Sequence, residues 1–322
     1  MARLTKIILT FLIVIFSFQA QAKNPPPGTG TADIPANILI MLDNSGSMGA
    51  KLYNSVQVYY PLDVATDSSG NVYVMEYYNN RIKVFDSSGT YLRSFGGYGS
   101  GCTRWQYARQ FDIYDDKIYI ADTYSHRVKI LSLTGSCIDW TTLNYYYPHA
   151  IAVDSKYVYV GNNSKYIYIH ERNRINRWNT YNAGSNLSYS WGMSLNSGGT
   201  RLLIADYVKN RLVEFIATGS SFSGGGQAML RYSNAGNTSY SSSNGYFRRP
   251  TDTGYDSSGN TYGLDLYGNR IQKFNSSLTY QAKVGTWSTS SGFRYPYGMH
   301  IDSNDNIYVT DFYNYAVRKY NT

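Results

Sequence analysis

The residues best suited to chemistry in this sequence lie between positions 43 and 47. An apolar run, residues 38–42, ends in Asp43, and Ser45 and Ser47 follow at alternate positions. A carboxylate and two hydroxyls on one tight loop present the hard oxygen ligands that Mg²⁺ and Ca²⁺ prefer. Asp43, Ser45 and Ser47 are therefore candidate metal ligands. Three oxygens on an isolated loop hold such an ion weakly, and we predict no other cofactor.

A second chemistry to consider is catalysis by a histidine-bound metal. The chain has four histidines, and a catalytic zinc needs three protein ligands and an open position. His149 follows a proline at the start of a predicted strand, and His300 lies further along another strand. The positions that we align with His149 hold no histidine: Leu62, Gln110, Trp191, Thr251 and Tyr297. At most His149 and His300 reach one ion, so we expect no zinc enzyme.

Paired carboxylates are the third possibility. Asp63 and Asp252 take equivalent positions in two repeats, where they could bind a cation or a sugar hydroxyl, although such acids more often cap turns. Other catalytic patterns are missing from the sequence. It contains no Gly-x-Ser-x-Gly phrase, and the glycines at 224–226 are not followed by Lys-Ser/Thr. We therefore predict no enzymatic activity.

A repeated phrase positions all these residues. An acid, an Arg five positions later and an alternating strand recur at residues 76–85, 122–131, 206–215 and 265–274. Short strands and Asp/Gly turns accompany the phrase at a period of roughly 40–50 residues, which predicts a propeller of four-stranded blades. Because the phrase recurs in most blades, we expect its acid and Arg to tie strands or blades together by charge-assisted hydrogen bonds.

Six blades can be counted, and the ring that they form must close. Their inner strands are predicted to begin at Pro61, Arg109, Pro148, Ser190, Pro250 and Pro296. The last blade has three strands before the sequence ends, which would leave an unpaired edge. We predict that a segment before Pro61 closes the ring. The candidates are residues 38–42, slightly favoured by their apolar run, and residues 55–60.

The repeat resembles the NHL-repeat family, which is named for an Asn-His-Leu phrase. The matching phrases are Asn80-Arg81-Ile82, His126-Arg127-Val128, Asn210-Arg211-Leu212 and Asn269-Arg270-Ile271. The resemblance implies an all-β, six-bladed propeller over residues 59–322, with the inner strands lining a central channel. On this fold the candidate partner-binding residues at the channel mouth are Asp63, Gln110, His149, Trp191, Asp252 and Tyr297.

Two shorter resemblances suggest alternative functions. Asp43-x-Ser45-x-Ser47 resembles the first metal-binding loop of a von Willebrand factor A domain, and its pairing with a propeller is similar to PilY-type pilus adhesins. The rest of such a domain is absent, so residues 23–58 are interpreted as a linker with a truncated A-domain strand. Pro148-His149 resembles a phrase of the peptide-amidating lyases, whose NHL propeller binds zinc.

The N-terminus is typical of a secretory signal peptide. Arg3 and Lys6 precede the apolar run 7–18, and Ala20-Gln21-Ala22 fits a cleavage site. The run is too short to span a membrane comfortably. We predict that residues 1–22 are removed by cleavage after Ala22 and that the product is a periplasmic or secreted monomer. Its two cysteines, Cys102 and Cys137, bracket the second blade and form either a disulfide or two free thiols.

Charge and aromatic content favour a contact surface. The formal charge of +8 falls to +6 without Arg3 and Lys6, and no Lys/Arg block is present, which together with export argues against a nucleic-acid partner. The chain has 35 tyrosines, which offer apolar area with a polar handle, although tyrosine also suits alternating strands. The sequence therefore predicts a non-enzymatic exported scaffold that presents a propeller face to a protein or glycan at the bacterial envelope.

Overall fold

The computed structural model describes residues 57–143, 146–218, 228–235, 239–289 and 292–321, all within the unit Ala32–Thr322. The predicted signal peptide at 1–22, the candidate metal loop with Asp43, Ser45 and Ser47, and the closing-strand candidate at 38–42 lie outside these residues. The described chain is all-β apart from three short 3-10 turns. None of its helices is long and apolar enough to cross a membrane.

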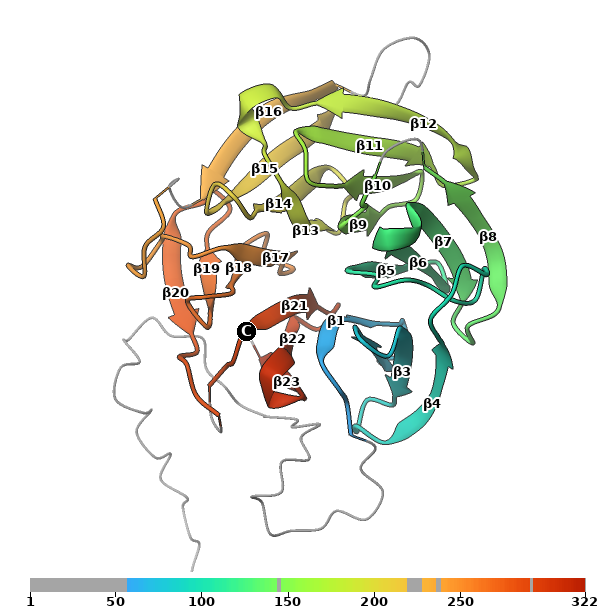
Figure 1. The fold of residues 1–322 in the computed structure, drawn as a ribbon. Coiled ribbons are helices and arrows are strands. Elements are labelled where there is room, and N and C mark those ends of the chain that lie inside the picture. The colour runs from blue at the N-terminus through green and yellow to red at the C-terminus, as the bar shows by residue number, and fades with distance from the viewer. Residues whose placement is uncertain (1–56, 144–145, 219–227, 236–238, 290–291, 322) are drawn as a thin grey trace, which may run out of the picture. The chain divides into compact units, whose positions relative to one another are not determined.

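Six antiparallel sheets stand around a central axis, one for each predicted blade (Figure 1). Blade one has β1 (Pro61–Thr66), β2 (Val72–Glu76), β3 (Arg81–Phe85) and β4 (Tyr91–Gly96). Blade two has β5 (Phe111–Tyr114), β6 (Lys117–Asp122), β7 (Arg127–Ser132) and β8 (Cys137–Thr142). Blade three has β9 (Ala150–Val153), β10 (Tyr157–Gly161), β11 (Tyr166–Glu171) and β12 (Arg174–Asn182).

The second half of the ring repeats this order. Blade four has β13 (Ser190–Leu195), β14 (Arg201–Asp206), β15 (Arg211–Thr218) and β16 (Ala228–Ala235). Blade five has β17 (Pro250–Tyr255), β18 (Thr261–Asp265), β19 (Arg270–Phe274) and β20 (Tyr280–Val284). Blade six has β21 (Pro296–Ile301), β22 (Asn306–Asp311) and β23 (Ala316–Asn321). The first strand of each blade is its inner strand, so six inner strands surround the channel.

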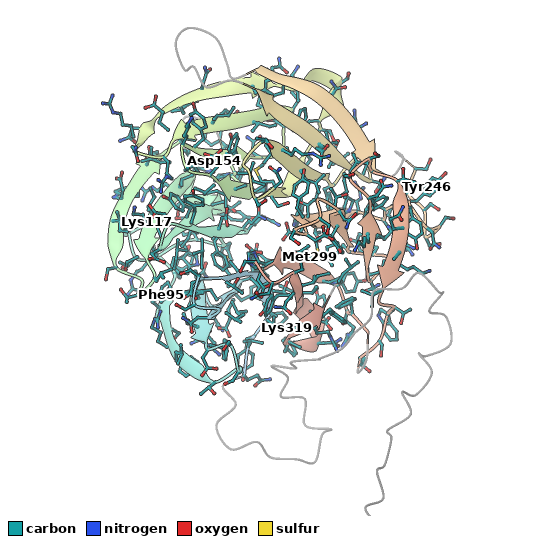
Figure 2. All side chains as sticks on the ribbon, turned by 180° about the vertical axis from the view of Figure 1, so that it is seen from behind. Phe95, Lys117, Asp154, Tyr246, Met299 and Lys319 are labelled. Atoms are coloured by element: carbon teal, nitrogen blue, oxygen red, sulfur yellow. A yellow bond between two sulfur atoms is a disulfide. The ribbon has the colours of Figure 1, made fainter. Side chains whose placement is uncertain are left out.

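Burial along the strands follows their distance from the axis. The second strands β2 and β10 are buried over their whole length, whereas the outermost strand β4 alternates between half-buried and exposed residues. Met299 of an inner strand lies close to the axis, and Phe95 of β4 lies at the periphery (Figure 2). Inner and second strands are apolar on both faces because neighbouring blades cover both.

The core consists of six apolar clusters, and each fills the space between two adjacent blades. The cluster between blades one and two contains Tyr73, Trp105 and Ile120, all fully buried. The cluster that closes the ring joins Val64 of blade one to Tyr308 of blade six. Apolar burial stabilises by about 25 cal/mol per Å². Since this buried surface lies between adjacent blades, the stability of each blade depends on both of its neighbours.

A hydrogen bond between blades six and one and the linker before β1 also contribute to the closure of the ring. Thr310 in β22 donates a hydrogen bond to the carbonyl of Leu62 in β1 at 3.1 Å. In the described residues the sixth blade has three strands. Residues 57–60, the described part of the second closing-strand candidate, form no strand. They are the linker that leads into β1, and Val58 is buried three residues before its inner strand, as Phe247 and Phe293 are before theirs.

The acid of the repeated phrase anchors the linker of its own blade. Its carboxylate accepts a backbone N–H from the linker and a charged donor from the phrase, as the sequence predicted. Asp265, for example, accepts the N–H of Arg248 at 2.7 Å and the Nε of Arg270 at 2.9 Å. The same arrangement recurs at Glu76, Asp206 and Asp311. One detail of the prediction is wrong, because Asp122 pairs with Lys129 at 3.1 Å instead of Arg127.

In four of the six blades the Asn or His of the phrase ties the blade to the next one. Its side chain accepts the backbone N–H of the residue at the end of the following linker. These pairs are Asn80 with Tyr107, His126 with Tyr147, Asn210 with Arg249, and Asn269 with Tyr295. Each of the four linker residues has a φ between 50° and 64°, a left-handed conformation that costs a non-glycine residue energy. The hydrogen bond therefore holds a strained turn immediately before four of the six inner strands.

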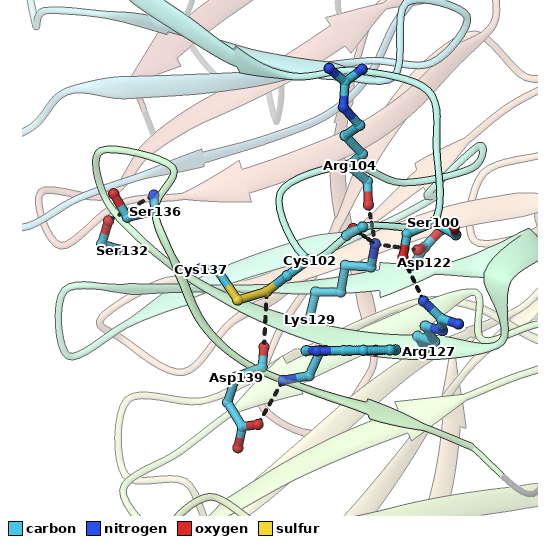
Figure 3. Close-up of a disulfide and its surroundings, with 12 residues drawn as sticks. Ser100, Cys102, Arg104, Asp122, Arg127, Lys129, Ser132, Ser136, Cys137 and Asp139 are labelled. Atoms are coloured by element: carbon cyan, nitrogen blue, oxygen red, sulfur yellow. Dashed lines mark hydrogen bonds and ion pairs between the residues drawn. A yellow bond between two sulfur atoms is a disulfide. The ribbon is translucent and has the colours of Figure 1, made fainter.

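A disulfide joins Cys102 and Cys137, which settles the alternative left open by the sequence (Figure 3). Cys102 lies in the linker between β4 and β5, and Cys137 is the first residue of β8. Lys129 holds the same linker by donating to the carbonyl oxygens of Gly101 and Arg104. The second blade is therefore fixed at its outer edge by a covalent bond and at its centre by a buried ammonium group.

Candidate functional site

The sequence-predicted site residues occupy two successive levels of the channel. Pairing with the second strands aligns Val64, Phe111, Ile151, Met193 and Met299 with one another. The residues two positions before these in each blade form one level of the channel, which we call the mouth: Leu62, Arg109, His149, Trp191, Thr251 and Tyr297. The residues one position before Val64 and its equivalents form the next level, which we call the neck: Asp63, Gln110, Ala150, Gly192, Asp252 and Gly298. Predicted residues His149, Trp191 and Tyr297 are at the mouth, whereas Asp63, Gln110 and Asp252 are deeper and at most 8% exposed.

The alignment of the second blade differs from the prediction by one residue. Ala108, not Arg109, takes the proline position, so Arg109 and not Gln110 is the mouth residue of this blade. In other repeats the inner strand begins six residues before the Asp of the following turn, and applying this spacing to Asp115 places the start at Arg109. In blade two, β5 and β6 are joined by the two residues Asp115 and Asp116, both with positive φ, whereas five residues join β1 and β2.

Trp191 occupies the centre of the mouth. Its ring stacks on Tyr207 with the centroids 4.4 Å apart, and the guanidinium of Arg109 lies 4.5 Å from its centroid. His149 lies parallel to Trp191 at 6.0 Å and shares a 3.2 Å hydrogen bond between Nε2 and the hydroxyl of Tyr189. Burial, with a contribution from Arg109, lowers the pKa of His149 to about 3. The imidazole is therefore neutral at physiological pH.

Tyrosines surround the mouth in a chain of contacting rings, which we call the tyrosine belt. Its members, in spatial order, are Tyr267, Tyr295, Tyr313, Tyr60, Tyr78, Tyr77, Tyr107, Tyr124 and Tyr147. Successive centroids are 4.8–6.2 Å apart. Tyr78 is 57% and Tyr124 46% exposed. The belt comes from the inter-blade linkers and the turns between second and third strands, so it marks one end of the ring, the belt face.

Sequence analysis noted the tyrosines but missed their arrangement. A usable signal was present: a tyrosine follows two residues after the phrase acid in four blades, as in Tyr78 and Tyr313. Another immediately precedes the inner-strand position, as in Tyr60 and Tyr295. These two positions are far apart within one repeat, but the propeller brings the linker of one blade beside the turn of another.

The neck is a hydrogen-bonded plug. Gln110 Nε2 reaches Asp252 Oδ1 at 3.1 Å and the carbonyl of Met193 at 3.2 Å. Asp63 accepts the N–H groups of Val64 and Phe111, at 2.9 and 2.8 Å. Asp252 likewise accepts the N–H groups of Thr253 in its own strand and of Met299 in the next blade. The expected turn-capping role of Asp63 and Asp252 is therefore wrong: each carboxylate joins two neighbouring inner strands.

Glycine completes the neck where a carboxylate needs space. A Cβ on Gly298 would lie 2.7 Å from Asp63 Oδ1 and 2.5 Å from the carbonyl oxygen of Leu62. A Cβ on Gly192 would lie 2.5 Å from Asp252 Oδ1. All three distances are shorter than a normal contact of a Cβ atom. Only glycine therefore fits at these two neck positions, which lie beside the buried carboxylates of Asp63 and Asp252.

Below the neck the channel widens into a cavity of about 220 Å³. Its lining includes Asp112, Ser194, Thr253, Tyr255 and His300. Asp112 repeats the role of the neck acids, because it accepts the N–H groups of Ile113 and Val153, each at 2.8 Å. Asp112 is thus engaged with backbone, whereas Ser194, Tyr255 and His300 bond to the side chains of Thr253, Glu214 and Thr66.

Burial raises the pKa of the three channel acids far above the ordinary value of 3.8. It raises that of Asp252 to about 8 and that of Asp112 to about 7. For Asp63 burial acts together with the charge of Asp252 and again raises the pKa well above normal. No cation pairs with these three carboxyls in the described residues.

Replacing Asp252 with asparagine should change how stability depends on pH. Between about pH 4 and pH 8 the folded protein binds more protons at Asp252 than the unfolded chain, so its free energy of unfolding falls as pH rises. The amide of the asparagine variant does not titrate. We expect the variant to be less stable at pH 5, because its amide cannot accept both N–H groups, and the deficit to shrink by at least about 1 kcal/mol at pH 8.5.

Urea denaturation at both pH values measures this difference. Histidines 149, 170 and 300, whose pKa values are lowered by burial, titrate in the opposite sense but equally in both proteins. Asp63 in the neck and Asp112 in the cavity below it remain in both proteins. A deficit of constant size at pH 5 and pH 8.5 would show that Asp252 is ionised throughout.

The two histidines that could share an ion lie at different depths. His149 is at the mouth, and His300 lines the lower cavity, where its Nε2 is 2.9 Å from Thr66 Oγ1. In the described part of the chain, no three His, Cys, Asp or Glu side chains are grouped to hold a metal ion.

Comparison with known proteins agrees with this architecture. Residues 58–85, which span the first three strands of blade one, match the family model of the NHL repeat. No curated protein matches the chain in sequence. Among solved structures, a streptogramin B lyase aligns with a TM-score of 0.59 at 13% identity, covering 88% of this chain and 87% of that one.

Two further structures have the same fold. An auxiliary nutrient binding protein from Bacteroides thetaiotaomicron aligns with a TM-score of 0.64 at 11% identity, over 81% of this chain and 69% of that one. A luciferin-regenerating enzyme aligns with a TM-score of 0.61 at 12% identity, over 83% and 93%. At such identities the likeness concerns the fold, which serves both binding proteins and enzymes.

The class that these observations define is the six-bladed β-propeller. Within that class the chain carries the NHL repeat.

Proposed function

We propose that the protein is an exported, non-enzymatic binding scaffold whose belt face contacts a protein or glycan at the bacterial envelope. The tyrosine belt carries the proposal: partly exposed rings form a contiguous aromatic surface around Trp191. Contiguous exposed aromatic patches mark interaction sites, and Trp and Tyr supply much of the energy at such sites. The predicted signal peptide, cleaved after Ala22, supports export.

The chemistry of the channel supports binding over catalysis. Asp63, Asp112 and Asp252 each accept two backbone N–H groups and hold neighbouring strands together. His149 is neutral and bonded to Tyr189. A general base must face its substrate with a pKa near the working pH, and the groups at the mouth, which a partner meets first, do not meet that condition.

Trp191 and Tyr297 are the expected anchors of the partner. Both are partly exposed at the mouth, and their rings lie 6.2 Å apart. Changing either residue to alanine should weaken partner binding by more than about 1 kcal/mol. A titration of the purified chain with its isolated envelope partner measures the effect.

Trp140→Ala is the matched control. Trp140 is 39% exposed but lies on the outer strand β8, away from the mouth, so its removal should leave the affinity unchanged. Equal affinities of the wild type, Trp191→Ala and Tyr297→Ala would exclude the mouth as the binding site.

A further inference from the structure

We propose that the partner of the belt face is an acidic polysaccharide, whose carboxylates bind the arginines of this face while its sugar rings stack on the tyrosine belt. This inference rests on the proposed function and narrows its partner to one chemical class. Its evidence is the distribution of charge over the two ends of the ring.

Two groups of arginines differ in their partners. Those of the repeated phrase, such as Arg270 and Arg211, are nearly buried and paired with a carboxylate. Those of the belt face have no carboxylate partner in the described residues: Arg104, Arg109, Arg248, Arg249 and Arg294. An arginine of the second group can still offer its planar fork to an external anion.

Carboxylates are absent from the accessible part of the belt face. The described linkers and turns that build it contain Arg104, Arg109, Lys165, Lys209, Arg248, Arg249 and Arg294 but no Asp or Glu. The nearest acids, such as Asp122 and Asp206, end the second strands and are fully buried. The described hairpin turns at the opposite end carry six acids that are not buried and only two basic residues, Lys156 and Arg172; these acids are Asp86, Asp115, Asp116, Asp154, Asp302 and Asp305. The belt face therefore attracts anions and the opposite end repels them.

Arg109 is the central cation of this face. Its guanidinium lies over Trp191 at 4.5 Å and near Tyr77 at 6.0 Å. Stacking on a ring holds a guanidinium in place while its edge stays open to a carboxylate. The Nε of Arg109 and the Nδ1 of the neutral His149 beside it are buried atoms without a hydrogen-bond partner among the described residues. Contact with an external carboxylate therefore falls to the terminal nitrogens of the Arg109 guanidinium.

The combination of cation and ring recurs around the axis. Arg249 lies over Tyr207 at 4.9 Å, and Arg294 lies over Tyr313 at 5.9 Å. A polymer with one carboxylate per sugar presents the same alternation of charge and apolar ring face. A folded protein offers no such periodicity. Nucleic acid does, but the cations are spread over several linkers and turns, at most two to each, instead of forming the dense phosphate-binding track typical of such partners.

Binding of the purified full chain to three immobilised polymers tests the inference. The polymers are polygalacturonate, neutral dextran and single-stranded oligothymidylate. We expect polygalacturonate to bind and its affinity to fall as salt is raised. The double variant Arg109→Gln/Arg294→Gln should bind it at least about tenfold more weakly, since hydrogen bonds to charged groups contribute about 1.5–3 kcal/mol each.

Arg174→Gln is the control, because Arg174 is an exposed arginine at the start of β12, outside the belt face; its affinity should equal that of the wild type. Arg109→Lys keeps the charge but not the fork and should give an intermediate affinity, with unchanged melting temperature as evidence of folding. Preference for dextran or oligothymidylate, or no binding to any of the three, overturns the inference. In those cases the effect of Trp191→Ala on the envelope partner still tests the proposed function separately.

Discussion

Replacing Asp265 with alanine should lower the free energy of unfolding by about 3–5 kcal/mol, because it leaves a buried cation without its counter-charge. Asp265 is fully buried and accepts bonds from Arg270 Nε at 2.9 Å and from two backbone N–H groups, of Arg248 and Gly268. Arg270 is 5% exposed and also holds three linker carbonyls, of Ser242, Ser243 and Tyr246. Loss of the carboxylate therefore loosens the whole linker before blade five. Urea denaturation measures the change.

Asp115→Ala is the control for this prediction. Asp115 pairs with Arg172 at 2.8 Å, but its side chain is 58% exposed, and exposed ion pairs contribute about 0–1 kcal/mol. Asp265→Asn, which keeps one acceptor oxygen, should fall between the two. If Asp265→Ala were no more destabilising than Asp115→Ala, the phrase acid would not hold the blade.

Removing the disulfide with Cys102→Ser/Cys137→Ser should lower the free energy of unfolding by about 3–4 kcal/mol. The cysteines are 35 residues apart in the sequence, and a cross-link over a loop of this size limits the unfolded chain by about that amount. Thermal or urea denaturation with and without reductant provides the measurement.

A reductant should destabilise the wild type to the level of the double serine variant and leave that variant unaffected. Lys129 remains in place in both proteins and continues to hold the linker at Gly101, so blade two should still fold. Equal stability of the oxidised wild type and the variant would contradict the expected contribution of the bond.

The fold was largely predictable because the same sequence pattern recurs in several blades. The acid of the phrase, its basic partner and the turn glycines recur at fixed spacing, so single departures such as Tyr166 at the Arg position of blade three do not obscure the count. The blade number and the all-β class follow from this redundancy. The pairing of Asp122 with Lys129 could not be read from spacing, because two basic residues of the same phrase lie within reach of one carboxylate.

The candidate site was harder to predict because depth in the channel depends on strand register. A shift of one residue in the alignment of an inner strand moves a residue from the mouth level to the neck level. The shorter turn at Asp115 and Asp116 caused such a shift in blade two. Arg109 was missed for this reason, and Asp63, Gln110 and Asp252 were placed one level too high. The tyrosine belt depends on contacts between successive repeats, which no single repeat contains.

In the described residues, the junction between blades six and one, like that between blades three and four, lacks the hydrogen bond that the other four junctions share. Where blades one, two, four and five place an Asn or His that accepts the next linker's N–H, blade six has Tyr315, whose ring meets that of Tyr60 at 4.8 Å. An aromatic contact tolerates sliding and tilting that a hydrogen bond to a fixed amide does not. We therefore expect the junction between blades six and one to open more easily than the four junctions that this hydrogen bond holds.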